Sequence, residues 1–344
     1  MSRLKEAISK IITGSNLSMA EASGAMQEIF SGQATDSQIA AFITGLRMKG
    51  ETPEEIAGCA FAMREKATPI QTKHEFFVDT CGTGGDGAHT FNISTTVALV
   101  LAGAGLPVAK HGNRSVSSRS GSADVLEALG VNLSLNPEQV GCCLDEIGLA
   151  FLFAPALHGA MKYAAGPRKE LGIRTIFNIL GPLTNPAQAQ AQVVGVFDPL
   201  LTETMAQVLA KLGTQQAFVV HGAQGLDEVA LCGPSKVSRM TAGAIDTFYL
   251  DPVEYGLHRA DNKALVGGSA KENAQITTQV LQGVRGACRD VVLVNAALGF
   301  IAGNKAEEIA EGIELAAKCI DSGAAFAKLE QLVGFTRAIN SPIA

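Results

Sequence analysis

The sequence predicts an α/β protein in which a small all-helical N-terminal domain precedes a large α/β domain with a central, mostly parallel sheet. Two observations support this prediction. Residues 1–72 carry apolar positions at helical spacing and contain no strand signal. From about residue 73 to residue 250, short apolar runs alternate with loops and helical segments, as a mostly parallel sheet requires. The 344 residues are enough for about two domains.

The N-terminal segment divides into several helices. The apolar positions with helical spacing include Ile39, Phe42, Ile43 and Leu46, and the turns are expected at Gly14–Asn16, Ser31–Thr35 and Gly50–Thr52. The stretch from Thr52 to Glu55 has every part of a helix start. Thr52 can cap, Pro53 suits the first helical position, and Glu55 completes a capping box.

The α/β segment begins with an apolar run at Glu75–Asp79, which we expect to be a strand. The elements expected after it are a helix at Ser94–Ala104, a strand at Pro107–Lys110, a helix at Ala123–Leu129, strands at Ala150–Phe153 and Ala217–Val220, and helices from about residue 270. Residues 158–186 break the alternation, because they are helical first and rich in turn residues afterwards. We interpret residues 166–187 as an excursion that joins residues 1–72 in the helical domain, with 73–344 forming the α/β domain. The crevice between two such domains is a common location for a substrate pocket.

Composition excludes several classes of protein. Lys+Arg 27 against Asp+Glu 33 gives a net charge of −6, which argues against nucleic-acid and anionic-membrane partners. The seven cysteines are scattered, odd in number and never spaced C-x-x-C, so neither a disulfide framework nor a structural zinc site is expected. The longest apolar run, Thr95–Ala109, is shorter than the roughly 20 residues of a bilayer span, and the N-terminus does not resemble a signal peptide. A reducing cytoplasm fits these features best.

A glycine-rich loop at Gly82–Gly87 lies between an expected strand and an expected helix. Backbone N–H groups at such a position, together with the helix dipole, can converge on a phosphate. The loop matches neither the Walker pattern nor G-x-G-x-x-G, and a tight turn is the alternative interpretation. Four polar side chains at the start of the following helix favour the phosphate interpretation, since ordinary capping needs only one. They are Thr90, Asn92, Ser94 and Thr95.

Two further clusters carry charge. Residues 110–119 hold Lys110, Arg114 and Arg119 together with a histidine and serines, which suits a second anion-binding loop, although a solvated surface loop is the alternative. Ser122 adds one more donor where the next helix opens. The acid pair Asp227-Glu228 follows a turn-rich stretch, and beside a polyphosphate it predicts Mg²⁺ rather than a mere surface pair.

Other reactive residue types receive no role. Cys81 adjoins the glycine-rich loop but has no identifiable partner base, so we interpret it as a packing residue. His74, His89 and His258 are interpreted as ordinary histidines, and neither zinc-ligand spacing nor G-x-S-x-G is found.

Five motifs together resemble the anthranilate phosphoribosyltransferase family over nearly the whole chain. They are G-T-G-G-D-G at 82–87, F-N-I-S-T at 91–95, K-H-G-N-R-S-V-S-S-x-S-G-S-A-D at 110–124, G-P-L-T-N-P at 181–186 and H-G-x-x-G-L-D-E at 221–228. The resemblance implies the helical and α/β domains already expected, a homodimer formed through the helical domain, and Mg²⁺ as cofactor. It also implies transfer of the phosphoribosyl group of 5-phosphoribosyl 1-pyrophosphate (PRPP) to the amine of anthranilate, the second step of tryptophan biosynthesis.

The resemblance assigns site residues position by position. The PRPP site is assigned to Gly82, Gly85, Asp86, Thr90, Asn92, Ile93, Ser94, Thr95, Lys110, His111, Gly112, Asn113, Arg114, Ser115, Val116, Ser117, Ser118 and Ser122. The anthranilate site is assigned to Gly82, Asn113, Arg168, His158, Pro155 and Gly181, and Mg²⁺ to Ser94, Asp227 and Glu228. Lys110, Asp227 and Glu228 are the implied catalytic residues.

Two departures and two rival functions accompany this resemblance. Arg119 stands where many members have Lys, and Pro167 precedes Arg168 where Val is commoner, so the approach of this arginine is the less secure assignment.

The related pyrimidine nucleoside phosphorylases share the fold but use a single orthophosphate and a K-H-S-type loop. A non-catalytic, nucleic-acid-binding homologue would show eroded site motifs and a basic groove, and the sequence shows neither.

Overall fold

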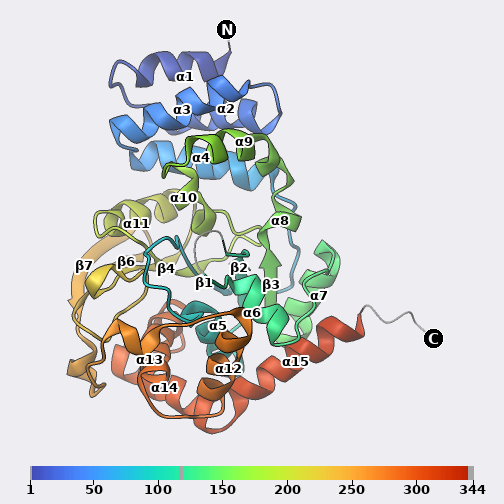
Figure 1. Ribbon diagram of the computed structural model, residues 1–344, viewed down its shortest axis with the longest axis vertical. Coiled ribbons are helices and arrows are strands. Elements are labelled where there is room, and N and C mark those ends of the chain that lie inside the picture. The colour runs from blue at the N-terminus through green and yellow to red at the C-terminus, as the bar shows by residue number, and fades with distance from the viewer. Residues whose placement is uncertain (1, 116–118, 340–344) are drawn as a thin grey trace.

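The computed structural model describes residues 2–115 and 119–339. Four N-terminal helices form a layer at one end of the molecule (Figure 1). They are α1 (Arg3–Ile11), α2 (Met19–Phe30), α3 (Asp36–Lys49) and α4 (Pro53–Lys66). The predicted helix start at Pro53 is confirmed: Thr52 Oγ1 accepts the Glu55 N–H at 3.3 Å, and Glu55 Oε2 accepts the Thr52 N–H at 2.8 Å.

A seven-stranded sheet forms the centre of the second domain, in the order β3-β2-β1-β4-β5-β6-β7. The strands are β1 (Val78–Gly82), β2 (Val108–Gly112), β3 (Leu149–Phe153), β4 (Ala191–Gly195), β5 (Gln216–His221), β6 (Ser235–Thr241) and β7 (Ala244–Leu250). The first five strands are parallel, and β6 and β7 add an antiparallel edge. The expected strand at Glu75–Asp79 is misplaced: β1 runs from Val78 to Gly82, because it pairs with β4 in the register Val78↔Ala191 to Gly82↔Gly195.

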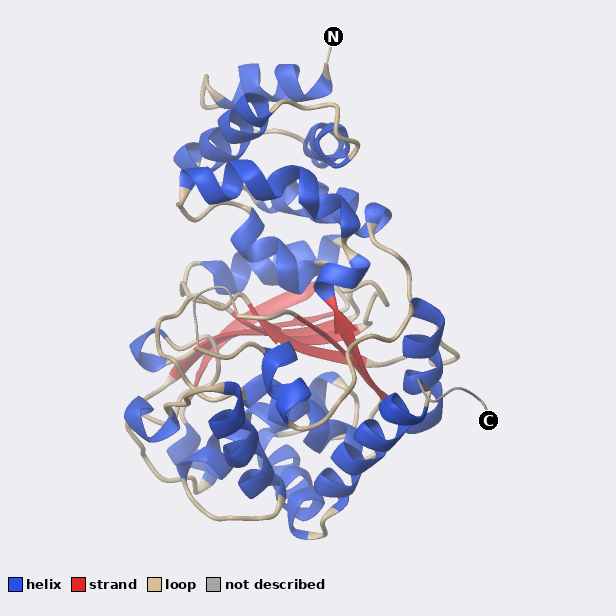
Figure 2. Cartoon of the chain, turned by 45° about the vertical axis from the view of Figure 1, so that its right-hand side comes forward, coloured by secondary structure: helices blue, strands red, loops and turns tan. Residues whose placement is uncertain are grey.

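Helices cover both faces of this sheet (Figure 2). Those after β1 are α5 (Ile93–Gly103), α6 (Ser122–Ala128), α7 (Pro137–Ile147), α8 (Ala154–Leu157), α9 (Lys162–Leu171), α10 (Phe177–Leu180), α11 (Leu201–Lys211), α12 (Ala270–Leu281), α13 (Ala287–Ala302), α14 (Ile309–Asp321) and α15 (Ala324–Ala338). One core packs α5 and the C-terminal helices against the sheet, and a second joins α11 and the opposite face to the N-terminal helices. The expected helices at Ser94–Ala104 and Ala123–Leu129 begin one residue earlier, at Ile93 and Ser122.

The chain crosses between the two domains three times. After α4 it passes to β1, after β3 it returns through α8 to α9, which packs against α2 and α3, and after α10 it passes to β4. The crossing segments lie side by side: the Thr68 N–H donates to the Leu157 carbonyl at 2.9 Å, and the Ile70 N–H to the Pro186 carbonyl at 3.4 Å. Residues far apart in sequence therefore meet at the junction between the domains.

Candidate active site

The glycine-rich loop, the basic loop and the acid pair all lie at the carboxyl ends of the parallel strands. β1 is followed by the glycine-rich loop and β2 by the basic loop, while the acid pair lies just beyond β5. The sheet order places β2 on one side of β1 and β4 on the other. This switch point is where open α/β sheets bind ligands.

The glycine-rich loop and the acid pair are in direct contact. Asp227 Oδ2 accepts the Gly84 N–H at 2.8 Å. A Cβ on Gly82 would lie 2.6 Å from the same oxygen, and a Cβ on Gly195 would lie 1.5 Å from the Asp227 carbonyl oxygen. These two strand ends must therefore be glycine for Asp227 to reach the loop.

Asp86, Asp227 and Glu228 lie in one small region, and the pKa values of Asp227 and Glu228 are raised there. Burial, followed by the neighbouring charge of Asp86, raises the pKa of Asp227 to about 7. Burial and Asp227 raise the pKa of Glu228 well above its usual range, against the opposing effects of Lys110 and the Ser94 N–H. Buried like charges of this kind are stabilised by a cation.

The residues present fit Mg²⁺. Among the residues that the structure describes, no group of three or more His, Cys, Asp or Glu side chains forms a ready-made metal cage. Mg²⁺ typically binds one or two carboxylates and takes its other ligands from substrate phosphates and water. Asp227, Glu228 and the Ser94 hydroxyl meet that description, since Ser94 lies next to both Glu228 and Lys110.

Lys110 is a buried cation beside this acid cluster. Its Nζ donates to the Thr80 carbonyl and, at 3.2 Å, to Ser94 Oγ. Burial lowers its pKa, while the fully buried Asp79 opposes that shift. Asp79 accepts the His111 N–H at 3.1 Å and the Asn185 amide at 2.8 Å, so it ties the basic loop to the segment after α10.

Sequence reasoning gave no role to Asp79 or Asn185. Asp79 is the acid in the apolar run at 75–79, and Asn185 lies in the turn-rich 181–186 motif. No local sequence pattern indicates that these two residues form a hydrogen bond.

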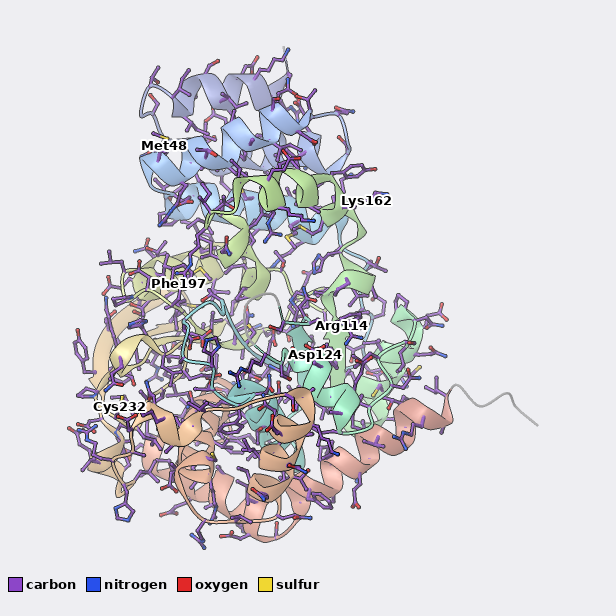
Figure 3. The ribbon with its side chains drawn as sticks, in the orientation of Figure 1. Met48, Arg114, Asp124, Lys162, Phe197 and Cys232 are labelled. Carbon is purple, nitrogen blue, oxygen red and sulfur yellow. The ribbon has the colours of Figure 1, made fainter. Side chains whose placement is uncertain are left out.

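The basic loop is braced by the helix that follows it. Ser122 Oγ donates to the Asn113 carbonyl at 3.1 Å, and Arg114 donates to Glu127 Oε1 at 2.8 Å. Arg114 also donates to Asp124 Oδ1 at 2.9 Å, and these two residues lie close together in Figure 3. The Ser115 N–H also donates to Asp124, at 3.1 Å. The Arg114 guanidinium is therefore already paired with acids, which leaves Lys110 as the positive charge beside the acid pair. Val116, Ser117 and Ser118, all predicted PRPP residues, lie outside the described residues.

The start of α5 contradicts the capping alternative for Asn92. Asn92 holds the N-cap position but makes no side-chain capping hydrogen bond. Its amide instead donates to the Ser120 carbonyl at 3.2 Å, and its oxygen accepts from Asn273 at 2.9 Å. Thr90 forms an isolated bridge to Val266, while Ile93 and Thr95 lie in the first turn of α5.

Histidines from two elements meet on the other side of Lys110. His111 Nε2 and His158 Nε2 are 3.1 Å apart, and both rings are buried. Burial lowers the pKa of His111 to about 3 and that of His158 to about 4. Gly181 reaches His111 through its backbone, and Pro155 lies in α8, just before His158. Of the predicted acceptor residues, His158 and Gly181 therefore contact His111, and Pro155 lies three positions before His158 in α8.

Arg168 lies on α9 in the helical domain. Its guanidinium carbon is 5.0 Å from the centroid of the Phe177 ring, and burial alone lowers its pKa. The sequence alone assigned no role to a second arginine, Arg174. Arg174 donates to the Gly85 carbonyl, and its guanidinium carbon lies 4.2 Å from the centroid of the Phe197 ring. The partners in that contact are 89 residues apart, so no local signal pointed to it.

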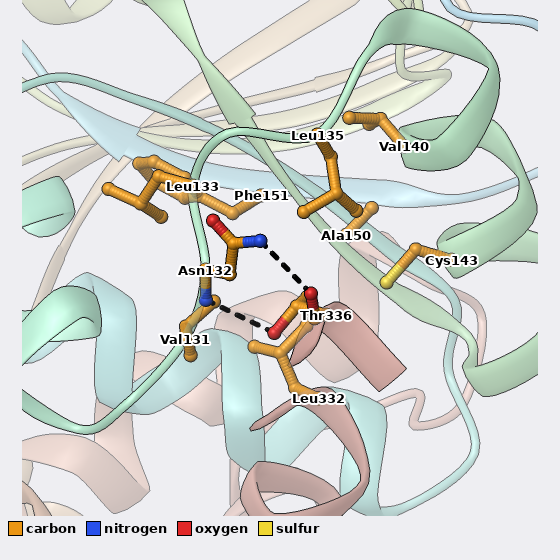
Figure 4. Close-up of a pocket in the computed structure, with 10 residues that line it drawn as sticks. All are labelled: Val131, Asn132, Leu133, Leu135, Val140, Cys143, Ala150, Phe151, Leu332 and Thr336. Atoms are coloured by element: carbon orange, nitrogen blue, oxygen red, sulfur yellow. Dashed lines mark hydrogen bonds between the residues drawn. The ribbon is translucent and has the colours of Figure 1, made fainter. Parts of the chain in front are cut away.

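The remaining candidates have ordinary environments. Burial raises the thiol pKa of Cys81 well above its usual range, which suits a packing residue rather than a nucleophile. His74 bonds the Leu144 carbonyl at 3.2 Å. A cavity of about 10 Å³ between β3, α7 and α15, crossed by two Asn132–Thr336 hydrogen bonds, is too small for a substrate (Figure 4). None of the helices in the described part of the chain is long and apolar enough to cross a membrane.

Two family models match this chain, and both describe a glycosyl transferase. Residues 5–67 match the model described as "Glycosyl transferase family, helical bundle domain", and residues 74–326 match "Glycosyl transferase family, a/b domain". The chain belongs to the anthranilate phosphoribosyltransferase family. A relative of that name from Moorella thermoacetica is 58% identical over 97% of this chain and 99% of its own length.

Solved structures agree with this family. Anthranilate phosphoribosyltransferase from Thermus thermophilus has a TM-score of 0.92 and 44% identity, over 98% of this chain and 100% of that one. The Saccharomyces cerevisiae enzyme in complex with PRPP and Mg has a TM-score of 0.89 and 30% identity, over 97% and 98%. The same yeast enzyme with 4-fluoroanthranilate has a TM-score of 0.87 and 29% identity over the same shares. The expected family, fold class and enzyme class are confirmed.

Proposed function

We propose that this protein transfers the phosphoribosyl group of PRPP to the amine of anthranilate, giving N-(5-phosphoribosyl)anthranilate and pyrophosphate. This is the second step of tryptophan biosynthesis from chorismate. The observation that carries the proposal is the convergence of the glycine-rich loop, Lys110 and the Asp227-Glu228 pair at the sheet's switch point, in a chain of this family.

The donor site consists of two loops and a metal. Backbone N–H groups of the 82–87 loop and polar groups at the start of α5 bind one phosphate region, and the 110–118 loop with Ser122 binds the other. Ser94, Asp227 and Glu228 would hold Mg²⁺, which when bound would supply positive charge to the pyrophosphate leaving group. Lys110 adds a fixed charge on the same side, and its contact with Ser94 sets its Nζ beside the metal ligands.

The acceptor site lies between the domains. The Arg168 guanidinium binds the carboxylate of anthranilate in a two-pronged hydrogen bond. Gly82, Asn113, Pro155, His158 and Gly181 surround the ring and the amine. Neutral His111 and His158 suit the uncharged ring and amine of anthranilate, because their lowered pKa values keep the pair free of charge at pH 7.

The chemistry needs little proton transfer before bond formation. The amine of anthranilate is neutral at pH 7, so the amine nitrogen attacks C1 of the ribose while the bond to pyrophosphate breaks, and the nitrogen then loses one proton to pyrophosphate or water. Positive charge on the ribose and negative charge on pyrophosphate grow together, and the fixed charges beside the leaving group stabilise that state. No covalent enzyme intermediate is required.

We also propose that the protein forms a homodimer through its helical domain. Two large apolar side chains project from the helical domain, Met48 at 83% exposure and Ile12 at 73%, near the ends of α3 and α1, which pack together. A homodimer through this surface buries them.

We further propose a cytoplasmic protein with no nucleic-acid partner. Its helical domain consists of residues 1–72 with 166–187, and its α/β domain consists of residues 73–344.

One assay tests the activity and one tests the site. Purified protein, PRPP, anthranilate and Mg²⁺ should produce the fluorescence change of N-(5-phosphoribosyl)anthranilate formation. Magnesium and PRPP at millimolar concentration should also raise Tm. A pyrimidine nucleoside phosphorylase would instead cleave a pyrimidine nucleoside with orthophosphate. That result, without turnover of anthranilate, would reject the proposal.

A further inference from the structure

Arg174 contacts the glycine-rich loop from the helical side of the molecule. It lies between α9 and α10, and its Nη2 donates a hydrogen bond to the Gly85 carbonyl. Its guanidinium stacks on Phe197, just after β4, with 4.2 Å between the guanidinium carbon and the ring centroid. Figure 3 places Phe197 at the end of the α/β domain that faces the helical domain. The contact therefore connects the returning helical segment with the donor loop.

The loop needs such a tether. Gly84 and Gly85 have φ values of +63° and +76°, in the left-handed region that glycine enters at no steric cost. A loop of this composition has many backbone conformations, and few of them aim its N–H groups at one ligand. A guanidinium held flat on an aromatic ring has already lost most of its own freedom, so it can fix a carbonyl with little further loss of entropy.

The tether continues to the predicted metal ligand. The Gly84 N–H, next to the tethered Gly85, donates to Asp227 Oδ2 at 2.8 Å. The Phe197 N–H donates to Thr83 Oγ1 at 3.2 Å, so the platform under the arginine also holds the start of the loop. Arg174 thus acts on Asp227 through two adjacent residues, Gly85 and Gly84.

We propose that Arg174 is a positioning residue that holds the glycine-rich loop and Asp227 in the arrangement that binds the magnesium pyrophosphate end of PRPP. This inference rests on the proposed function and deepens it. Arg168 and Arg174 are six positions apart on the same segment. The first serves the acceptor and the second the donor.

Calorimetric titration of Mg²⁺ and PRPP into the protein without anthranilate tests this role. Arg174→Ala should raise the Kd by about fivefold or more, as expected for loss of a stacked, hydrogen-bonded guanidinium. In steady state, KM for PRPP and the half-saturating Mg²⁺ concentration should rise, while KM for anthranilate stays within about twofold. Arg174→Lys should recover part of the loss, because an ammonium can donate to Gly85 but cannot stack as a planar group. Lys169→Ala, which removes a charge from an exposed position on α9, is the matched control and should change none of these values.

A second variant keeps the test decisive. Phe197→Leu should weaken PRPP binding in the same direction, and adding it to Arg174→Ala should cause little further loss, because both act on one contact. If Arg174→Ala is folded and binds magnesium PRPP as the unaltered protein does, or if only KM for anthranilate changes, the inference is wrong. The titration needs no turnover. An unaltered protein that binds PRPP without forming product would therefore reject the proposed activity while leaving Arg174 testable.

Discussion

The acid pair makes the sharpest prediction at the scale of single residues. Asp227→Asn/Glu228→Gln should lower turnover by roughly 100-fold or more and raise the Mg²⁺ requirement, because the metal loses both charged ligands. Unfolding without ligand should occur at no lower temperature, since the change removes two buried, mutually repelling carboxylates. Steady-state kinetics across a Mg²⁺ series and a melting curve measure both effects.

A matched control is available in Glu307 and Glu308, an adjacent acid pair that is exposed before α14. Glu307→Gln/Glu308→Gln should leave turnover and the Mg²⁺ requirement unchanged. Full activity of the Asp227/Glu228 double variant at low Mg²⁺ would instead make that pair a structural feature only.

Lys110 is expected to act on both binding and turnover. Lys110→Ala should raise KM for PRPP and lower kcat, because its charge opposes the charge that grows on pyrophosphate. Lys110→Met, which keeps the buried stem, separates loss of charge from loss of packing. Added salt should weaken PRPP binding only in part, since the backbone N–H contacts of the 82–87 loop are little screened. An effect confined to KM for anthranilate would contradict this role.

Arg168 is expected to act on the other substrate. Arg168→Ala should raise KM for anthranilate by roughly 10-fold or more, equivalent to about 1.4 kcal/mol, with little change in KM for PRPP. Arg168→Lys should restore part of the loss, since the ammonium lacks the planar fork. The alternative to this role is that Arg168 is a solvent-exposed residue paired with Glu170, and its contact with the Phe177 ring argues against that alternative. Unchanged KM for anthranilate in Arg168→Ala would remove this residue from the site.

At the scale of elements, β2 and the end of α8 are joined by the His111–His158 contact. Both folded-state pKa values, about 3 and about 4, lie below the ordinary 6.5, so folding favours the neutral rings. Their contribution to stability is complete above pH 6.5 and is lost as the pH falls toward 4, because the unfolded chain binds protons first. Each histidine can account for at most about 1.4 kcal/mol per pH unit in that window.

His158→Asn tests this dependence. Denaturant unfolding at pH 7.5 and pH 5 should show a smaller acid-induced loss for the variant than for the unaltered protein. The difference between the two proteins isolates the histidine from the carboxylates, which titrate in both. Equal losses would show that the pair does not limit acid stability.

Elements were predictable where neighbouring residues determine them. The start of α4 follows from Thr52, Pro53 and Glu55 alone, and the structure has the capping box in full. The register of β1 depends on β4, more than 100 residues later, so the apolar run at 75–79 indicated a strand but misplaced its ends. The glycine-rich loop, Lys110 and the acid pair were recognisable as motifs. Asp79 and Arg174 were not, because Asn185 and Gly85 are brought to them only by folding.

At the scale of the whole molecule, the exposed apolar residues of the helical domain predict the assembly. Met48→Asp/Ile12→Asp should convert a dimer to a monomer in light scattering after gel filtration, because a charge at a buried interface is costly. Val284→Asp, at an exposed position between α12 and α13, is the control and should leave the mass unchanged. A monomeric unaltered protein would contradict the predicted homodimer.

The connections between the two domains also determine how the protein behaves after proteolysis. The Thr68 N–H binds the Leu157 carbonyl and the Ile70 N–H binds the Pro186 carbonyl, so the crossings lie close together, and a shared hydrophobic core also joins the N-terminal helices to α11 and the sheet. A protease that cuts the first crossing, between α4 and β1, leaves α1–α4 attached to the rest of the chain by packing alone. The nicked chain should therefore migrate as fragments after denaturation and as a single species before it. The N-terminal helices should therefore stay with the rest of the enzyme after such a cut, because the hydrophobic core that they share with α10, α11 and the sheet holds them without a peptide bond.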